Sequence, residues 1–241
     1  MDGMGGMGRV LGVLGGMGPL ASAHFMARLT LLTPAERDQD HVPAILWSDP
    51  RVPDRGLAQM GTGPDPLPFL VRGLSGLAAA GCGAVAIPCN TAHGWIDGMR
   101  AATALPILHI IDAAVADLRR QVVPPGPVGI MGTAATLEMR LYQGDLAAAG
   151  WPCIEPTSAE MTQFVLPAIA AVKASRVGDA YAPLAEAVLA LRVRGAQAVI
   201  LGCTEIPLGL QTGPYETLRV PLVDTIDALA RASIAWARET A

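Results

Sequence analysis

Short apolar runs alternate with longer stretches of helical periodicity along the whole chain. Runs of four or five apolar residues, such as those before the two cysteines at 89 and 203, are typical of buried strands. We predict strands at Val10–Leu14, Ala44–Trp47, Ala84–Ile87, Ile107–His109, Val128–Met131, Ala198–Leu201 and Leu222–Val223, with a short edge strand around Cys153. Helices are predicted at Pro19–Leu32, Pro66–Ala80, Ala92–Ala102, Asp112–Gln121, Ala134–Ala149, Ala159–Val172, Asp179–Arg194 and Thr225–Glu239. This alternation favours parallel sheets with helices on both faces.

The same pattern occurs twice in the chain. Cys89 and Cys203 each follow an apolar run, at an offset of 114 residues (203 − 89), and Gly12–Gly15 recurs as Gly129–Gly132 at a similar offset. We therefore predict an α/β fold of two similar lobes, each a parallel sheet flanked by helices. The lobes are expected to be related by a pseudo-twofold axis, with an active site in the cleft between them. The predicted lobes are 1–103, completed by 218–241, and 104–217.

The composition of the chain argues against several classes of binding partner. The formal net charge of the 241-residue chain is −4 and its 17 basic residues form no runs, which argues against a nucleic-acid partner. No apolar run approaches the roughly 18 residues of a membrane span, so no membrane partner is expected. The four cysteines lack the spacing of a zinc site, which predicts free thiols, no metal and a cytoplasmic protein. A small-molecule substrate is the remaining expectation.

A glycine-rich turn follows the first predicted strand. Gly16 and Gly18 superficially fit a dinucleotide fingerprint, but the acidic residue expected about 20 positions later, at the end of a second strand, is absent. Backbone N–H groups at the helix start at Pro19 equally suit a small carboxylate. We prefer the carboxylate interpretation.

Two of the four cysteines stand where reactive groups gather in parallel α/β folds, at the carboxyl ends of strands. Either one alone is commonly a buried core residue. However, Cys89 precedes Asn90–Thr91 and Cys203 precedes Thr204–Glu205, where a helix N-terminus is expected to lower a thiol pKa. Two nearby thiols would share one proton, which suits removing a proton from one face of a carbon and returning one to the other. The other two cysteines lack this setting and are interpreted as structural.

The segments LGGMGP (14–19), PCNTAH (88–93) and GCTEIP (202–207) resemble the aspartate racemase branch of the cofactor-independent aspartate/glutamate racemase superfamily. The resemblance spans nearly the whole chain and keeps the order and spacing of the motifs. It implies an isomerase that racemises aspartate or glutamate with no cofactor, and a homodimer. It also implies that Cys89 and Cys203 are the acid/base pair, one for each face of the substrate α-carbon.

The resemblance assigns further residues to the substrate. It implies that Arg55 and Lys173 meet the side-chain carboxylate, which charge-assisted pairing discriminates from neutral groups. Arg55 falls in the loop 48–65, which we expect to act as a lid. The other implied substrate contacts are Gly18, Pro19, Asn90, Thr91, Thr133 and Thr204, with Glu205 supporting Cys203 and His93 supporting Cys89.

Simpler interpretations of some of these residues stay open. An arginine in a loop is usually a solvated charge, Thr133 is also a candidate helix N-cap, and His93 equally fits a helix surface. The chain also departs from many members of the family, which carry a histidine in the final helix where Ile226–Leu229 stands here. That difference leaves the substrate range open.

Other functions also stay open at this point. Maleate isomerases, hydantoin racemases and arylmalonate decarboxylases of the same superfamily use similar sites for other chemistry. A redox thiol pair would predict a Cys89–Cys203 disulfide. A pyridoxal enzyme would have to use Lys173, the only lysine, which lies in a predicted helix without a phosphate-binding loop.

Overall fold

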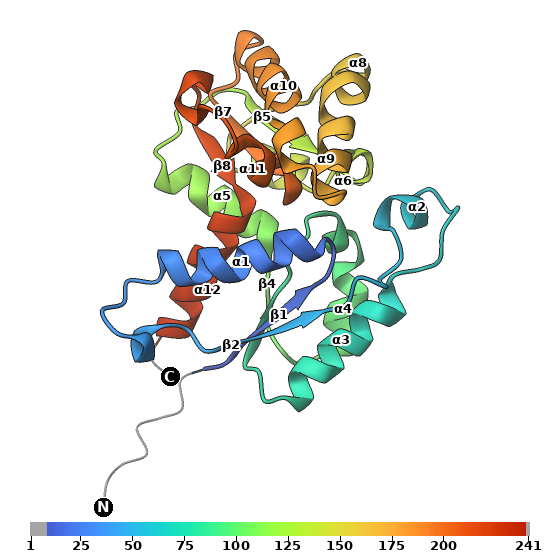
Figure 1. Ribbon diagram of the computed structural model, residues 1–241, viewed down its shortest axis with the longest axis vertical. Helices are drawn as coiled ribbons and strands as arrows, with labels where there is room; N and C mark the ends of the chain where they lie inside the picture. The colour runs from blue at the N-terminus through green and yellow to red at the C-terminus, as the bar shows by residue number, and fades with distance from the viewer. Residues whose placement is uncertain (1–8, 240–241) are drawn as a thin grey trace, which may run out of the picture.

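The computed structural model describes residues 9–239, and two parallel four-stranded sheets form its frame (Figure 1). The first sheet has the order β2-β1-β3-β4, with β1 (Leu11–Gly15), β2 (Ala44–Ser48), β3 (Ala84–Ala86) and β4 (Ile107–Leu108). The second has the order β6-β5-β7-β8, with β5 (Val128–Gly132), β6 (Cys153–Ile154), β7 (Ala198–Gly202) and β8 (Leu222–Asp224). The identical order of equivalent strands confirms the predicted α/β fold of two similar lobes.

Helices follow most strands and cover the sheets (Figure 1). The α-helices are α1 (Pro19–Leu32), α2 (Arg55–Gln59), α3 (Leu67–Ala79), α4 (Ile96–Ala102), α5 (Ile110–Arg120), α6 (Ala134–Glu138), α7 (Gln143–Ala148), α8 (Ser158–Glu160), α9 (Leu166–Lys173), α10 (Tyr181–Val193), α11 (Glu205–Leu210) and α12 (Thr225–Arg238). Short 3₁₀ segments are η1 (Asp38–Asp40), η2 (Thr91–Trp95), η4 (Val177–Asp179) and η5 (Tyr215–Leu218), and a π-helical turn, η3 (Met161–Val165), joins α8 to α9.

One predicted helix is broken. The prediction of a continuous helix over Ala134–Ala149 was wrong, because α6 ends at Glu138 and α7 begins only at Gln143. Between them Arg140 adopts a left-handed backbone conformation with φ +52°, which a helix cannot contain. The break leaves Tyr142 in front of α7 with its side chain buried.

The observed strand pairing does not coincide with the predicted lobe boundaries. β4 pairs with β3 through Val85 and Ile107, and β8 pairs with β7 through Val199 and Leu222. The boundaries after 103 and 217 therefore separate each fourth strand from its own sheet. We propose that the first lobe ends after β4 and the second after β8, with α12 returning to pack against α1 of the first lobe. Residues 1–8 and 240–241 of the predicted first lobe lie outside the described residues.

A single hydrophobic core runs through both lobes. It contains Val13 of β1, Ile130 of β5 and Ile226 of α12, each fully buried, and the helix α5 packs against α12 within it. Burying a large aliphatic side chain contributes about 1.5–3 kcal/mol. Each lobe also has one further hydrophobic cluster of its own, on its outer side. Because the shared core contains side chains of both sheets, it holds the two lobes together.

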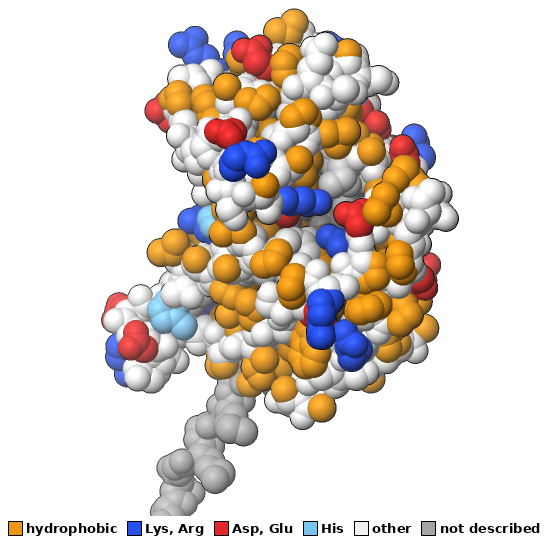
Figure 2. Space-filling model, turned by 45° about the vertical axis from the view of Figure 1, so that its right-hand side comes forward, with side chains coloured by type: hydrophobic (Ala, Val, Ile, Leu, Met, Phe, Trp, Pro, Cys, Tyr) orange, Lys and Arg blue, Asp and Glu red, His pale blue; other side chains and the backbone are white. Residues whose placement is uncertain are grey.

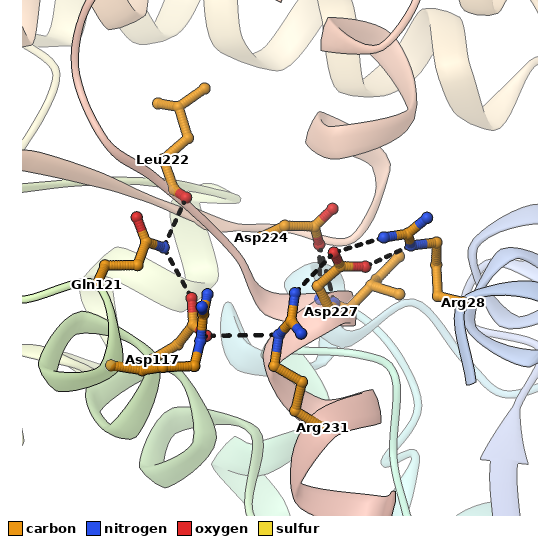
Figure 3. A network of polar contacts seen from close by, with 9 residues as sticks. Arg28, Asp117, Gln121, Leu222, Asp224, Asp227 and Arg231 are labelled. Carbon is orange, nitrogen blue, oxygen red and sulfur yellow. Dashed lines mark hydrogen bonds and ion pairs between the residues drawn. The ribbon is translucent and has the colours of Figure 1, made fainter. Parts of the chain in front are cut away.

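A network of polar contacts surrounds α12 where it meets α1 and α5 (Figure 3). Arg28 of α1 pairs with Asp227 of α12 through contacts of 2.5 and 2.8 Å. Arg231 lies 3.8 Å from Asp227 and 3.7 Å from Asp117 of α5. Gln121 then joins Asp117 to the carbonyl oxygen of Leu222 in β8, at 2.8 and 3.0 Å. Partly exposed ion pairs of this kind contribute only about 0–1 kcal/mol each, so the hydrophobic core contributes more to stability than this network does.

Candidate active site

Two adjoining cavities lie between the lobes. The larger, about 450 Å³, is lined from the first lobe by Gly16–Leu20 and from the second by Val172, Lys173 and Glu205. The smaller, about 230 Å³, is lined by Thr91, Thr133 and residues of α9. Asp54, Arg55 and Lys173 line both cavities, so the two spaces meet at these charged side chains. Figure 2 shows the molecule hollowed between the two lobes, with basic and acidic side chains gathered there.

The loop after β1 forms one wall of the larger cavity. Gly16 has φ +93°, and a Cβ there would stand 2.5 Å from the backbone of Asp49, so only glycine fits. Ser22 accepts a hydrogen bond from the Gly16 N–H (2.9 Å) and donates one to the Gly18 carbonyl (2.8 Å). A Cβ on Gly18 would stand 2.8 Å from Glu205 Oε1, so this loop reaches the second lobe. Pro19 is the first residue of α1.

Cys89 follows β3 and is buried, and His93 holds its backbone. His93 Nδ1 lies 3.0 Å from the Cys89 carbonyl oxygen, and His93 Nε2 accepts a hydrogen bond from the Ile110 N–H at 3.3 Å. Nε2 therefore carries no proton, and Nδ1 donates to Cys89. Burial, followed by the neighbouring His109, lowers the pKa of His93 to about 3, so the ring stays neutral. His93 is 1% exposed, which rules out the helix-surface interpretation.

Asn90 and Thr91 connect the Cys89 loop to the second lobe. Asn90 Oδ1 accepts a hydrogen bond from the Tyr142 hydroxyl, and Asn90 Nδ2 donates to Thr225 Oγ1 at 3.2 Å. The Thr91 hydroxyl lies 3.0 Å from that of Thr133 and 2.9 Å from that of Thr136. Thr133 is also the N-cap of α6, so both predicted roles of its position are compatible. Three hydroxyl groups thus meet across the lobes beside the smaller cavity.

Cys203 follows β7, and Glu205 binds its thiol. The Cys203 thiol donates a hydrogen bond to Glu205 Oε2 at 3.0 Å. Burial and the negative charge of Glu205 raise the pKa of Cys203 well above its ordinary value, while the charge of Lys173 acts in the opposite direction. The expectation that the helix N-terminus lowers this pKa was wrong, because burial and the carboxylate outweigh the helix end. Cys203 is therefore a proton-bearing thiol at neutral pH.

The two cysteine motifs touch each other. The Thr204 hydroxyl lies 3.4 Å from the Pro88 carbonyl oxygen, to which it donates, and 3.4 Å from Glu205 Oε2. Thr204 is the residue after Cys203, and Pro88 is the residue before Cys89. The contact therefore brings the carboxyl ends of β3 and β7 together at the lobe boundary.

Arg55 and Lys173 approach the cavities from opposite lobes. Arg55 begins α2, and its Nη1 donates to the carbonyl oxygens of Val52 (3.2 Å) and Pro53 (2.9 Å). Lys173 is the last residue of α9. The structure thus places both predicted carboxylate-binding cations against the same two cavities. Motion of the 48–65 loop as a lid stays a prediction.

Sequence reasoning missed three residues around the site. Asp54 lines both cavities and caps α2 by accepting the Leu57 N–H at 3.0 Å. Its pKa is lowered: burial acts to raise it, but the Leu57 N–H and the charges of Lys173 and Arg55 outweigh burial. Aspartate is a preferred N-cap residue, and Asp54 directly precedes α2, so its residue type is a signal that the sequence does contain. Thr136 lies inside α6 and donates its backbone N–H to the Thr133 cap at 3.1 Å, and neither Thr136 nor Tyr142 has a comparable signal of its own.

Disulfides, metal-binding clusters and membrane-spanning helices are absent from the described residues. The four cysteines are free thiols. Across residues 9–239, His, Cys, Asp and Glu side chains do not gather in groups of three or more that could hold a metal ion. In the same span, no helix has the length and apolarity needed to cross a membrane.

Fold and site together define a two-lobed α/β protein in which two strand-end cysteine motifs come into contact at the lobe boundary through Thr204 and Pro88. The family model for Asp/Glu/hydantoin racemases matches residues 14–233 of the chain. The chain belongs to this family and is an isomerase of the amino-acid racemase type.

Individual relatives agree with this assignment. Over 231 residues, covering 93% of this chain and 96% of the relative, the chain is 24% identical to the broad specificity amino-acid racemase RacX of Bacillus subtilis (strain 168). The structure of Picrophilus torridus aspartate racemase is similar with a TM-score of 0.84 and 30% identity, over 95% of this chain and 94% of that one. Glutamate racemase from Francisella tularensis shares the fold, with a TM-score of 0.66 and 18% identity over 95% and 81% of the two chains.

Proposed function

We propose that this racemase acts on aspartate, with glutamate as the competing substrate, by moving the α-proton between Cys89 and Cys203. The observation that carries the proposal is the contact between the two cysteine motifs, through Thr204 and Pro88, beside cavities that hold Arg55 and Lys173. Two strand-end thiols at the lobe boundary, together with two cations that line the cavities there, suit a small substrate with an acidic side chain. The 30% identity to an aspartate racemase supports aspartate as the first candidate.

The substrate would be held at both of its carboxylates. Arg55 and Lys173 would pair with the side-chain carboxylate, since charge-assisted hydrogen bonds discriminate it from neutral groups. The side chains of Asn90, Thr91, Thr133 and Thr204 would hold the α-carboxylate. The backbone of Gly18 and Pro19 would form the floor of the site. Pro19 has no N–H, so the N–H groups that favour negative charge there are those of the other residues at the start of α1.

The proton transfer uses one proton shared by the two thiols. In this proposal Cys203 holds that proton as a thiol bound to Glu205, and the mechanism requires Cys89 to act in its thiolate form when it removes the α-proton. The C–H bond breaks, its electron pair stays on the substrate, and an S–H bond forms at Cys89. The S–H bond of Cys203 then breaks as its proton adds to the opposite face of the carbon. The reverse enantiomer uses the same steps with the thiols exchanged.

Two residues would support the cysteines without touching the substrate carbon. Glu205 orients and raises the pKa of the Cys203 thiol, and His93 fixes the Cys89 carbonyl. The reaction proposed here needs no cofactor. The homodimer and the cytoplasmic location stay predictions.

The test is a substrate panel with the purified protein and no added cofactor. L- and D-aspartate, L- and D-glutamate and alanine are incubated separately, and the enantiomers are separated by chiral chromatography. We expect racemic aspartate, with kcat/KM at least about tenfold above that for glutamate, a difference of about 1.4 kcal/mol. A higher kcat/KM for alanine than for both acidic amino acids would contradict the assigned role of Arg55 and Lys173.

A further inference from the structure

One buried tyrosine contacts the neighbours of both cysteines. The Tyr142 hydroxyl donates a hydrogen bond to Asn90 Oδ1, and Asn90 directly follows Cys89. The Tyr142 ring lies against Gly202, which directly precedes Cys203: a Cβ on Gly202 would stand 3.5 Å from Tyr142 Cε2. Tyr142 is only 1% exposed, so its ring is fixed by packing. A single rigid side chain therefore spans the two loops that carry the thiols.

The bond from Tyr142 continues as a chain of hydrogen bonds. Because Asn90 Oδ1 accepts from Tyr142, Asn90 Nδ2 is turned toward Thr225 Oγ1, 3.2 Å away. The Thr225 hydroxyl in turn donates to the Leu201 carbonyl oxygen at 2.9 Å. Leu201 lies in β7, two residues before Cys203. The chain thus starts at the loop after β3 and ends on the strand that leads to the second cysteine.

The Tyr142 hydroxyl stays a donor throughout the proposed reaction. Burial raises the pKa of Tyr142, and the negative charge of a Cys203 thiolate raises it further. The hydroxyl therefore keeps its proton whichever of the two thiols is ionised. Within the described part of the chain, the two cavities are lined by other side chains, so Tyr142 acts from behind the site.

We propose that Tyr142 is a positioning residue that sets the distance between the Cys89 and Cys203 sulfur atoms. This inference rests on the proposed two-thiol racemisation. Each proton transfer needs a sulfur aligned with the α-carbon from its own side, and an error of about 1 Å in such a geometry can lower a rate about 100-fold. Removing the hydroxyl frees the Asn90 amide and loosens the Cys89 loop from the Cys203 loop.

The test compares the wild-type enzyme with Tyr142→Phe, which keeps the ring and removes only the hydroxyl. We expect kcat to fall at least about tenfold in both directions while KM changes less than about twofold, because the loss affects alignment in the transition state. In heavy water, exchange of the α-proton with retention of configuration should rise relative to inversion. One thiol still removes the proton, but the opposite thiol delivers one less often.

Matched variants separate positioning from general damage. Tyr181→Phe removes another tyrosine hydroxyl bond, to the Pro214 carbonyl oxygen at 2.9 Å, and should leave kcat and the exchange ratio unchanged. Thr225→Val breaks the same chain of hydrogen bonds and should reproduce the effect of Tyr142→Phe. Thr225→Ser keeps the hydroxyl and should have the kcat and exchange ratio of the wild-type enzyme. The Tyr142→Phe/Thr225→Val double variant should be less impaired than the product of the single effects, since both act through Asn90. Thermal unfolding of each variant shows that it is folded at the assay temperature.

Two results would overturn the proposal. An unchanged kcat and exchange ratio in Tyr142→Phe would show that the hydroxyl does not set the thiol spacing. A rise in KM alone would show that Tyr142 serves only the substrate contact of Asn90. Both are distinct from failure of the proposed function itself, in which the wild-type protein racemises no amino acid.

Discussion

The Thr204 hydroxyl donates to the Pro88 carbonyl oxygen, 3.4 Å away, across 116 positions of sequence. This contact joins the end of β7 to the end of β3 and brings the flanks of Cys203 and Cys89 together. The two cysteine motifs are equivalent by duplication, but their surroundings differ. Glu205 binds the Cys203 thiol, whereas a neutral His93 binds the backbone of Cys89. The Cys203 thiol therefore has a carboxylate neighbour that helps to raise its pKa.

Glu205→Gln should lower the pKa of Cys203. The carboxylate charge raises this pKa in the wild-type protein, so its removal favours the thiolate. The pH dependence of Cys203 alkylation, followed by peptide mass spectrometry, should shift to lower pH. Glu186→Gln, an exposed position on α10, serves as the control and should leave the profile unchanged. An unchanged or upward shift in Glu205→Gln would show that burial alone controls this thiol.

Replacing Arg55 or Lys173 should weaken the binding of acidic substrates. Hydrogen bonds to charged groups contribute about 1.5–3 kcal/mol, so Arg55→Gln and Lys173→Gln should each raise KM for aspartate about 10- to 100-fold. Steady-state kinetics with both enantiomers measure the change. Arg176→Gln removes an exposed cation close to Lys173 in sequence and should have little effect. Equal losses for aspartate and alanine would contradict side-chain carboxylate recognition.

His93 should make the fold sensitive to acid. Its folded-state pKa, about 3, lies below the ordinary 6.5, so between these values the unfolded chain binds more protons than the folded one. The contribution of His93 to stability is thus complete above about pH 6.5 and is lost as the pH falls toward 3. His93→Gln should show a shallower decline in unfolding free energy between pH 6.5 and 4, measured by urea titration. Parallel curves for both proteins would mean that His93 does not titrate on unfolding.

Gly16→Ala should damage both fold and activity more than Gly61→Ala. Both glycines have positive φ, +93° and +71°, so an alanine at either position strains the backbone in the same way. Only at Gly16 would the new methyl group meet backbone, at 2.5 Å from Asp49, whereas at Gly61 nothing lies within 4 Å. Overpacking adds about 1–3 kcal/mol at the first site. Equal losses of unfolding free energy in the two variants would show that the loop around Gly16 shifts to accommodate the methyl group at little cost.

Local signals in the sequence predicted most of the strands and helices that build the two lobes. Helix α1 begins at Pro19 and ends at Leu32 as predicted, because proline at the first helical position marks its start. The apolar runs before Cys89 and Cys203 located β3 and β7 within one residue. The strand ends and the repeated motifs singled out two of the four cysteines, and the catalytic role of these two stays a prediction.

Features that depend on distant contacts could not be predicted. The lobe boundaries were placed before β4 and β8, strands of two and three residues whose sheet is decided by pairing rather than by their own pattern. The raised pKa of Cys203 depends on burial and on the direction in which Glu205 points. Tyr142 sits in a break of a segment with a continuous helical pattern, and its partner Asn90 is 52 positions away.

The central claim is that Cys89 and Cys203 act on opposite faces of the α-carbon, and early product formation in heavy water tests it most directly. L-aspartate is incubated with the enzyme in heavy water, and both enantiomers are analysed by chiral separation with mass spectrometry. A two-thiol mechanism predicts that newly formed D-aspartate carries deuterium at the α-carbon while the remaining L-aspartate keeps its protium. Cys89→Ala and Cys203→Ala should each abolish racemisation. Racemisation that survives either substitution, or D-aspartate that retains the original α-proton, would contradict the account.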